Sequence, residues 1–290
     1  MPRARCHWAL LIQTREALRD AVPEAHRLVT DHRGEFFAGG IAPDAIRLFA
    51  GRDKPSSHFY DDQRQETWES VAVAAAMCAA QPAVADPRRL SPEGRAWLLG
   101  YLTHVLTDVA YWRHVLSRLP PFPAQAGAHH GAWVLADQHA IPAAERHLDG
   151  AALRFEHAPP WVDEHAVRRM LERVTGRVLP PDGMWPVELA YARNRLDLEG
   201  KTDGEVLRRV QPEWEANVAA ARAAVPEAQW EAFRRDAVRG AVAAVAAYLA
   251  LGAGDGALGV PGGALALGDA AAPAADAERA LSEEPAAGGG

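Results

Sequence analysis

Histidine and aspartate stand inside the most apolar stretches of this 290-residue chain. The clearest case is "THVLTD", in which His104 and Asp108 are four residues apart and surrounded by leucines and valines. On a helix, side chains at this spacing share one face and can reach a common point. Because a buried polar group must be compensated, the pair is either a metal chelate or a hydrogen-bonded pair in the core. Taken by itself, the motif favours the hydrogen-bonded pair.

Three further polar side chains are candidates for the same site. Asp44 and His58 stand in a segment rich in glycine and proline, and His7 begins the first apolar stretch. Loops on a rigid scaffold often carry functional groups, although each of these residues could also be a satisfied loop or half-buried side chain. The only cysteines, Cys6 and Cys78, have no CxxC spacing, so nitrogen and oxygen atoms must hold any metal.

Three strings in this order, "FFAGGIAPDAI", "SHFYDD" and "GYLTHVLTDVAYW", resemble the bacterial zinc-dependent phospholipase C family. The resemblance covers about residues 5 to 150. It implies an all-α fold that holds a cluster of zinc ions and hydrolyses the phosphodiester of phospholipids. The single-strand-specific zinc nucleases have a similar fold and metal arrangement.

The resemblance assigns roles to five residues. It implies that His58, His104 and Asp108 bind metal, and that Asp108 bridges two ions. Asp44 matches the carboxylate that orients or deprotonates a metal-activated water, and it also binds metal. His7 matches a histidine ligand of the first helix.

The remaining ligands of the family are matched less closely. His114 has the family's offset from the HxxxD motif, but no helix breaker precedes it, so a solvent-facing helix residue is an equally good interpretation. His129 is followed four residues later by Trp133, where the family has glutamate, whereas His130 and Asp137 are seven apart and could share a face. We predict His114, His129 and Asp137 as further metal ligands, with an absent second half-site as the alternative.

These residues fit metal-assisted chemistry, because divalent ions neutralise phosphodiester oxygens and lower the pKa of a bound water. Imidazole and carboxylate ligands suit zinc, and Mn or Fe could occupy the same ligands. We predict two or three zinc ions and hydrolysis of phosphodiester bonds, of phospholipids above all. The alternatives are a non-catalytic helical protein with a structural or vestigial metal site and a nuclease-like phosphodiesterase. Four aromatic residues could line an approach for acyl chains or pack in the core: Phe59, Tyr60, Tyr111 and Trp112.

Helical periodicity dominates the chain and predicts an all-α, single multi-helix domain over residues 1–253. The helices are expected at 5–21, 65–80, 91–118, 130–148, 162–177, 203–224 and 226–252. Segment 34–62 is predicted to be turns around one short helix at 44–50, because glycine and proline interrupt it. Residues 254–290 form an Ala/Gly-rich tail of low complexity, which we expect to be disordered.

Charge and targeting signals restrict the partners. A net charge of -7 argues against a broad nucleic-acid surface, so a small-molecule or lipid phosphodiester, with peripheral membrane contact, is expected. The start "MPRARCHWALLI" has too short an apolar run for an export signal, and the longer apolar stretches are too short or interrupted to span a bilayer. The sequence therefore predicts a cytoplasmic protein and leaves its oligomeric state open.

Overall fold

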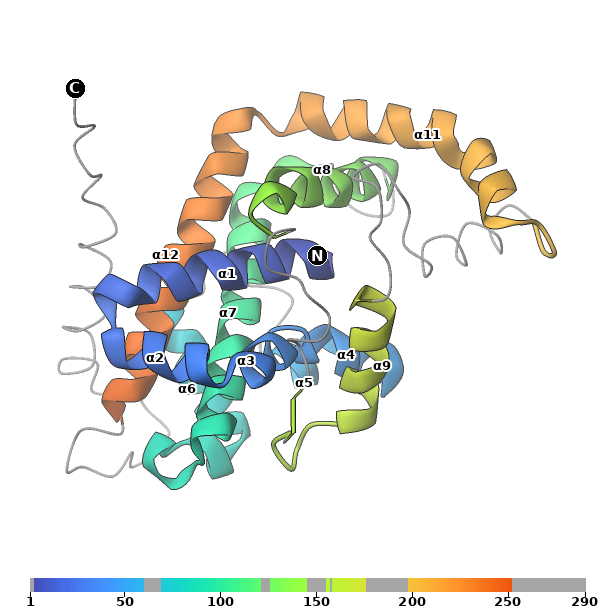
Figure 1. Ribbon diagram of the computed structural model, residues 1–290. Helices are drawn as coiled ribbons and strands as arrows, with labels where there is room; N and C mark the ends of the chain where they lie inside the picture. Colours follow the sequence, from blue (N-terminus) through green and yellow to red (C-terminus); the bar gives the residue numbers. More distant parts are fainter. Residues whose placement is uncertain are drawn as a thin grey trace.

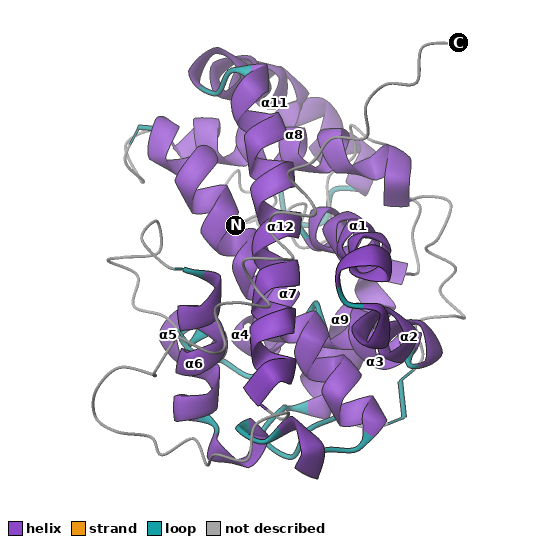
Figure 2. Ribbon diagram, turned by 90° about the vertical axis from the view of Figure 1, so that its left-hand side faces the viewer, coloured by secondary structure: helices purple, strands orange, loops and turns teal. Residues whose placement is uncertain are grey.

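The computed structural model describes residues 3–59, 69–120, 126–144, 155–156, 158–175 and 198–251. Within these ranges the regular structure is helical and contains no strand, which confirms the predicted all-α fold (Figure 2). The low-complexity tail, 254–290, lies outside the described residues, so its predicted disorder stays a prediction.

Eleven helices carry labels in the described residues. In chain order they are α1 (Ala4–Ala21), α2 (Pro23–Asp31), α3 (Arg33–Gly39), α4 (Ala42–Phe49), α5 (Lys54–His58), α6 (Ser70–Ala80), α7 (Pro92–His114), α8 (Ala126–Ala144), α9 (Glu164–Thr175), α11 (Asp203–Ala224) and α12 (Glu227–Leu251). Single 3-10 turns lie at Pro82–Val84, Pro87–Arg89 and Leu116–Arg118. The predicted bounds of 203–224 are those of α11. The prediction for α1 differs from the structure by one residue at its start, and that for α12 by one residue at each end.

Helix α7 runs through the middle of the molecule, with α12 packed along it and α3 and α1 crossing it (Figure 1). Its start is fixed by Ser91, whose hydroxyl accepts a hydrogen bond from the Gly94 amide at 3.2 Å, and by Pro92 in the first turn. Every residue from 96 to 111 is buried. A helix that is covered all round forms the centre of a fold, so His104 and Asp108 are interior residues.

The prediction of turns over 34–62 is wrong for its described part, 34–59. Helix α4 corresponds to the predicted short helix, beginning two residues earlier and ending one residue earlier, but α3 and α5 also form there. The glycines serve close packing instead: a Cβ on Gly39 would lie 2.0 Å from the Trp97 carbonyl oxygen, and one on Gly100 would lie 2.0 Å from that of Phe36. Glycine therefore lets the backbone of α3 lie directly against α7.

None of the described helices combines the length and apolarity that crossing a bilayer requires.

Candidate metal centre

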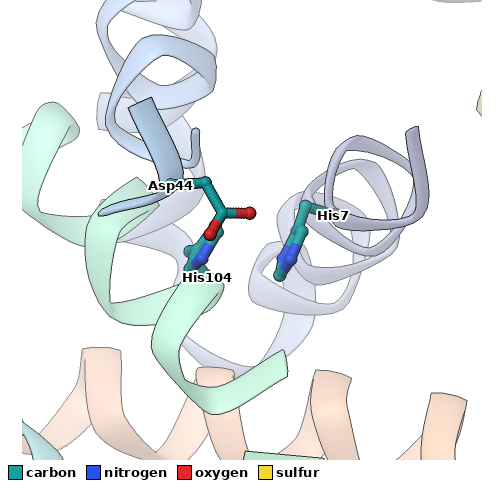
Figure 3. A group of neighbouring side chains, drawn as sticks. All are labelled: His7, Asp44 and His104. Carbon is teal, nitrogen blue, oxygen red and sulfur yellow. The ribbon is translucent and has the colours of Figure 1, made fainter. Parts of the chain in front are cut away.

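Five of the predicted site residues converge beside the middle of α7. They come from four helices: His7 from α1, Asp44 from α4, His58 from α5, and His104 and Asp108 from α7. Their ligand atoms form two overlapping groups, each lying within 4.8 Å: His7 with Asp44 and His104, and His58 with His104 and Asp108. In Figure 3 the Asp44 carboxylate and the imidazoles of His7 and His104 face the same space.

The Asp108 carboxylate connects the histidines. Its Oδ2 lies 3.2 Å from His58 Nε2 and 3.9 Å from His104 Nε2, and its Oδ1 lies 3.6 Å from His7 Nε2. The Asp44 Oδ1 lies 3.7 Å from His58 Nε2. Only the 3.2 Å contact is within hydrogen-bond distance, so the other pairs face one another across a gap of intermediate length.

Burying these polar side chains costs free energy unless a further group, such as a metal ion, binds between them. The side chains of His7, His58, His104 and Asp108 are at most 1% exposed, whereas Asp44 is 14% exposed. Both ring nitrogens of His7 lack a hydrogen-bond partner within the described part of the chain, and so does the Nε2 of His104. Buried polar atoms are nearly always satisfied, so these nitrogens fit a divalent cation as their partner.

The ring orientations of two histidines are set by groups behind them. His104 Nδ1 lies 2.7 Å from the Gly40 carbonyl oxygen, which can only accept, so Nδ1 donates and the Nε2 lone pair faces the cluster. His58 Nδ1 lies 2.8 Å from the Ser57 hydroxyl, and that hydroxyl lies 3.3 Å from the Lys54 carbonyl oxygen. A hydroxyl that donates to Lys54 accepts from His58 Nδ1, so His58 Nε2 also presents a lone pair.

The end of α5 is held in place by aromatic side chains. Phe59 ends the helix in the left-handed conformation at φ 61°, which is uncommon for a residue other than glycine. Its ring packs against Tyr101 and Trp161 at centroid distances of 5.4 and 5.9 Å. The Tyr101 hydroxyl also donates to the Ser57 carbonyl. These contacts fix the backbone that carries His58.

The charge states follow from burial. Burial lowers the pKa of His7 and of His104, so both rings are neutral, which suits their stacking at a centroid distance of 3.8 Å. Burial by itself raises the pKa of Asp108, but the close contacts with His58 and His104 outweigh it and hold this pKa well below its usual range. Neutral imidazoles around an anionic carboxylate are the donor set that zinc prefers.

Two other predicted ligands make contacts outside this cluster. His114 Nε2 lies 2.7 Å from Asp236 Oδ2, and its Nδ1 lies 3.4 Å from Gln229 Oε1, so α12 engages both ring nitrogens. His129 Nε2 lies 2.8 Å from the Pro120 carbonyl oxygen. Neither residue joins a group of potential metal ligands within the described ranges.

Asp137 also lies apart from both groups of ligands. It is 2% exposed on α8, and its Oδ1 accepts a hydrogen bond from the Cys6 amide at 3.2 Å. Its neighbour in the sequence pattern, His130, places its ring 4.8 Å from that of Trp133. The structure therefore brings five of the eight predicted ligands together and leaves His114, His129 and Asp137 out of that cluster.

The aromatic residues that could line an approach for acyl chains have different positions. Phe59 and Tyr111 are buried in the core, and Trp112 is half-buried. Tyr60 lies outside the described residues.

The sequence interpretation missed the groups that orient the imidazoles, namely Gly40, Ser57 and Tyr101. Ser57 gave a usable signal, because a hydroxyl directly before a histidine can bond its ring. The Gly40 carbonyl gave none, since every residue carries a carbonyl oxygen and only the fold selects one.

A helical fold with buried imidazoles around a carboxylate defines a class of protein, the helical metalloproteins whose ions are held by nitrogen and oxygen. A comparison with family models agrees: the model described as zinc dependent phospholipase C matches residues 6–166, more than half of the chain and all five clustered residues. The chain belongs to the zinc-dependent phospholipase C family, and this family indicates a zinc-dependent hydrolase of the phospholipase C type. A comparison with curated proteins finds no match, and one with solved structures finds none either.

Proposed function

We propose that the protein is a zinc-dependent phosphodiesterase that cleaves phospholipids. The observation that carries this proposal is the convergence of His7, Asp44, His58, His104 and Asp108, with ring nitrogens of His7 and His104 buried and unpartnered within the described residues. Membership in the zinc-dependent phospholipase C family supplies the metal and the class of reaction.

The arrangement favours two zinc ions that share Asp108. His104 belongs to both groups, but the single lone pair of its Nε2 can bind one ion, because Nδ1 is engaged by Gly40. The two oxygens of Asp108 face different histidines, Oδ2 toward His58 and His104 and Oδ1 toward His7. Asp108 would therefore be suited to help hold both ions. Mn or Fe would accept the same ligands.

Asp44 is the residue we assign to the attacking water. When bound, zinc neutralises phosphate oxygens and lowers the pKa of water toward neutrality. Asp44 is the most exposed member of the cluster, so its carboxylate can meet water while the others are enclosed. It orients that water and accepts its proton, a role that requires the carboxylate to lie within hydrogen-bond reach of the water. His7 and His104 stay neutral and keep their lone pairs for the metal.

The proposed substrate is a phospholipid, met at a lipid surface. Leu48 lies on α4 one helical turn after Asp44, hence on the same face, and it is 54% exposed. An apolar side chain next to the water-facing carboxylate is consistent with peripheral contact between this side of α4 and acyl chains.

The test compares His104→Ala with His114→Ala. Both variants remove an imidazole from α7, but only His104 lies in the cluster. The wild-type protein is expected to hold two zinc equivalents by elemental analysis and to hydrolyse phosphatidylcholine vesicles and bis(p-nitrophenyl) phosphate. His104→Ala should lose zinc and both activities, whereas His114→Ala should keep them.

Three results would overturn the proposal or its substrate. A wild-type protein that holds no zinc after zinc supplementation has no such centre. Equal zinc content and activity in the two variants would refute the choice of ligands. Cleavage of single-stranded DNA in preference to both phosphodiesters would replace the lipid substrate by a nucleic acid.

A further inference from the structure

We infer that Asp137 is a positioning residue that holds His7 in the metal cluster through the first turn of α1. The inference rests on the proposed function, because His7 is one of the proposed zinc ligands. It gives Asp137 a role different from the direct ligation that the sequence predicts.

The contact lies at the start of α1. Asp137 is 2% exposed; its Oδ1 accepts a hydrogen bond from the Cys6 amide at 3.2 Å, and its Oδ2 lies 3.5 Å from Arg3 Nη1. The N-cap residue of α1 is Arg3, whose side chain makes no capping hydrogen bond. The first amides of a helix need acceptors from elsewhere, so Asp137 supplies from α8 what a capping side chain normally provides. Its negative charge also suits the positive end of the helix dipole.

The His7 ring lacks the orienting hydrogen bond that the other two histidines have. The ring of His104 is held by the Gly40 carbonyl, and that of His58 by the Ser57 hydroxyl. Neither ring nitrogen of His7 has a hydrogen-bond partner in the described part of the chain, and the ring stacks on His104 and faces Asp108 Oδ1 at 3.6 Å. The position of His7 is thus set by its backbone, and its backbone follows directly after the amide that Asp137 binds.

Arg3, which contacts Asp137 of α8, also contacts helix α11. The Arg3 guanidinium lies over the Trp214 ring of α11, 5.1 Å from its centroid. Helix α8, which carries Asp137, packs closely on α11, since a Cβ on Gly131 would lie 2.0 Å from the Asn217 carbonyl oxygen. Helix α11 lies outside the family-matched residues 6–166. In this chain, the helix that carries His7 is therefore held by contacts with α11, which lies beyond the matched region.

The experiment measures zinc content and zinc affinity in Asp137→Ala and Asp137→Asn, with Asp236→Asn as the control. Asp236 is another largely buried carboxylate, bound to His114 rather than to α1. Loss of a group that orients a ligand weakens metal binding by about 10–100-fold. Asp137→Ala should therefore lower the affinity for the zinc ion bound by His7 by that factor. The ion of His58, His104 and Asp108 should stay bound. Asp137→Asn should retain both ions, because its amide oxygen still accepts from the Cys6 amide.

A double variant separates positioning from ligation. If Asp137 acts through His7, His7→Ala and His7→Ala/Asp137→Ala will hold the same number of zinc equivalents. If Asp137 is itself a ligand of another ion, the losses will add, and Asp137→Asn will lose zinc as Asp137→Ala does. Either of those results, or unchanged zinc affinity in Asp137→Ala, overturns the inference.

Circular dichroism and thermal unfolding verify that each variant folds. Should Asp137→Ala fail to fold, zinc loss in a folded Asp137→Asn still overturns the inference, and retention of both ions still supports it. A wild-type chain that binds no zinc defeats the proposed function instead, so the two failures are distinguishable.

Discussion

Replacement of Gly100 by alanine tests whether the contact between α3 and α7 shapes the metal centre. The new Cβ would lie 2.0 Å from the Phe36 carbonyl oxygen and 2.9 Å from the Gly40 amide nitrogen. Ordinary contact begins at 3.4 Å, so the backbones must separate by about 1.4 Å. Overpacking of this kind costs about 1–3 kcal/mol. Because Gly40 moves with α3, its 2.7 Å bond to His104 Nδ1 would lengthen to about 4 Å and be lost.

Two measurements follow, thermal unfolding and zinc affinity by competition with a chromophoric chelator. Gly100→Ala should melt several degrees lower and bind zinc about 10–100-fold more weakly, because His104 loses the group that orients it. Gly94→Ala is the matched control on the same helix, where the new Cβ would meet the Ser91 hydroxyl at 3.5 Å, an ordinary contact. If Gly100→Ala melts and binds zinc as Gly94→Ala does, the argument from the helix crossing is refuted.

Two further variants test individual carboxylates. Asp44→Asn should lower kcat for bis(p-nitrophenyl) phosphate by about 10²–10⁴-fold, because the amide cannot take a proton from water, and a kcat like that of the wild type would exclude this role. Asp236→Asn tests the contact with His114. Burial raises the pKa of Asp236, but the hydrogen bond from His114 and the charge of Arg239 outweigh it and hold this pKa below its usual range. A lowered folded-state pKa stabilises the fold above the unfolded value, and this stabilisation is lost as pH falls through the folded value. Asp236→Asn should therefore unfold more easily than the wild type at pH 7, with the difference shrinking below about pH 4; a constant difference in chemical-denaturation midpoints would contradict this origin.

The long helices could be predicted because their sequences carry local signals. Helix α11 begins at a capping box in which Thr202 and Glu205 bond each other's backbone, and α7 begins at a serine cap followed by proline. The short helices between residues 23 and 58 carry weaker signals. In α3 the glycines indicate loops by propensity, but their purpose is contact with α7, and tertiary packing overrides propensity here. A contact with a helix some sixty residues away cannot be predicted from the local sequence pattern.

The candidate site also has a part that the local sequence predicts and a part that only the fold determines. The spacing of His104 and Asp108 lets one helix present both side chains to one point, and this follows from periodicity alone. The meeting of α1, α4 and α5 with α7 follows from tertiary structure, and the sequence indicated it only through resemblance to a family. Of the orienting groups, Ser57 precedes its histidine directly in the sequence, whereas the Gly40 carbonyl reaches His104 from 64 residues away and is selected only by the fold.

The position of His114 shows how helix geometry limits what such a resemblance can transfer. Helix α7 continues unbroken from Pro92 to His114, so six residues after Asp108 correspond to a rotation of about 600°, or roughly 120° away from the Asp108 direction. A side chain pointing that way meets α12, where Asp236 and Gln229 engage both of its ring nitrogens. Only a break in the helix before residue 114 would turn this imidazole back toward the cluster. In this chain, the continuity of α7 therefore favours a contact that joins α7 to α12 over a third metal ligand on the same helix.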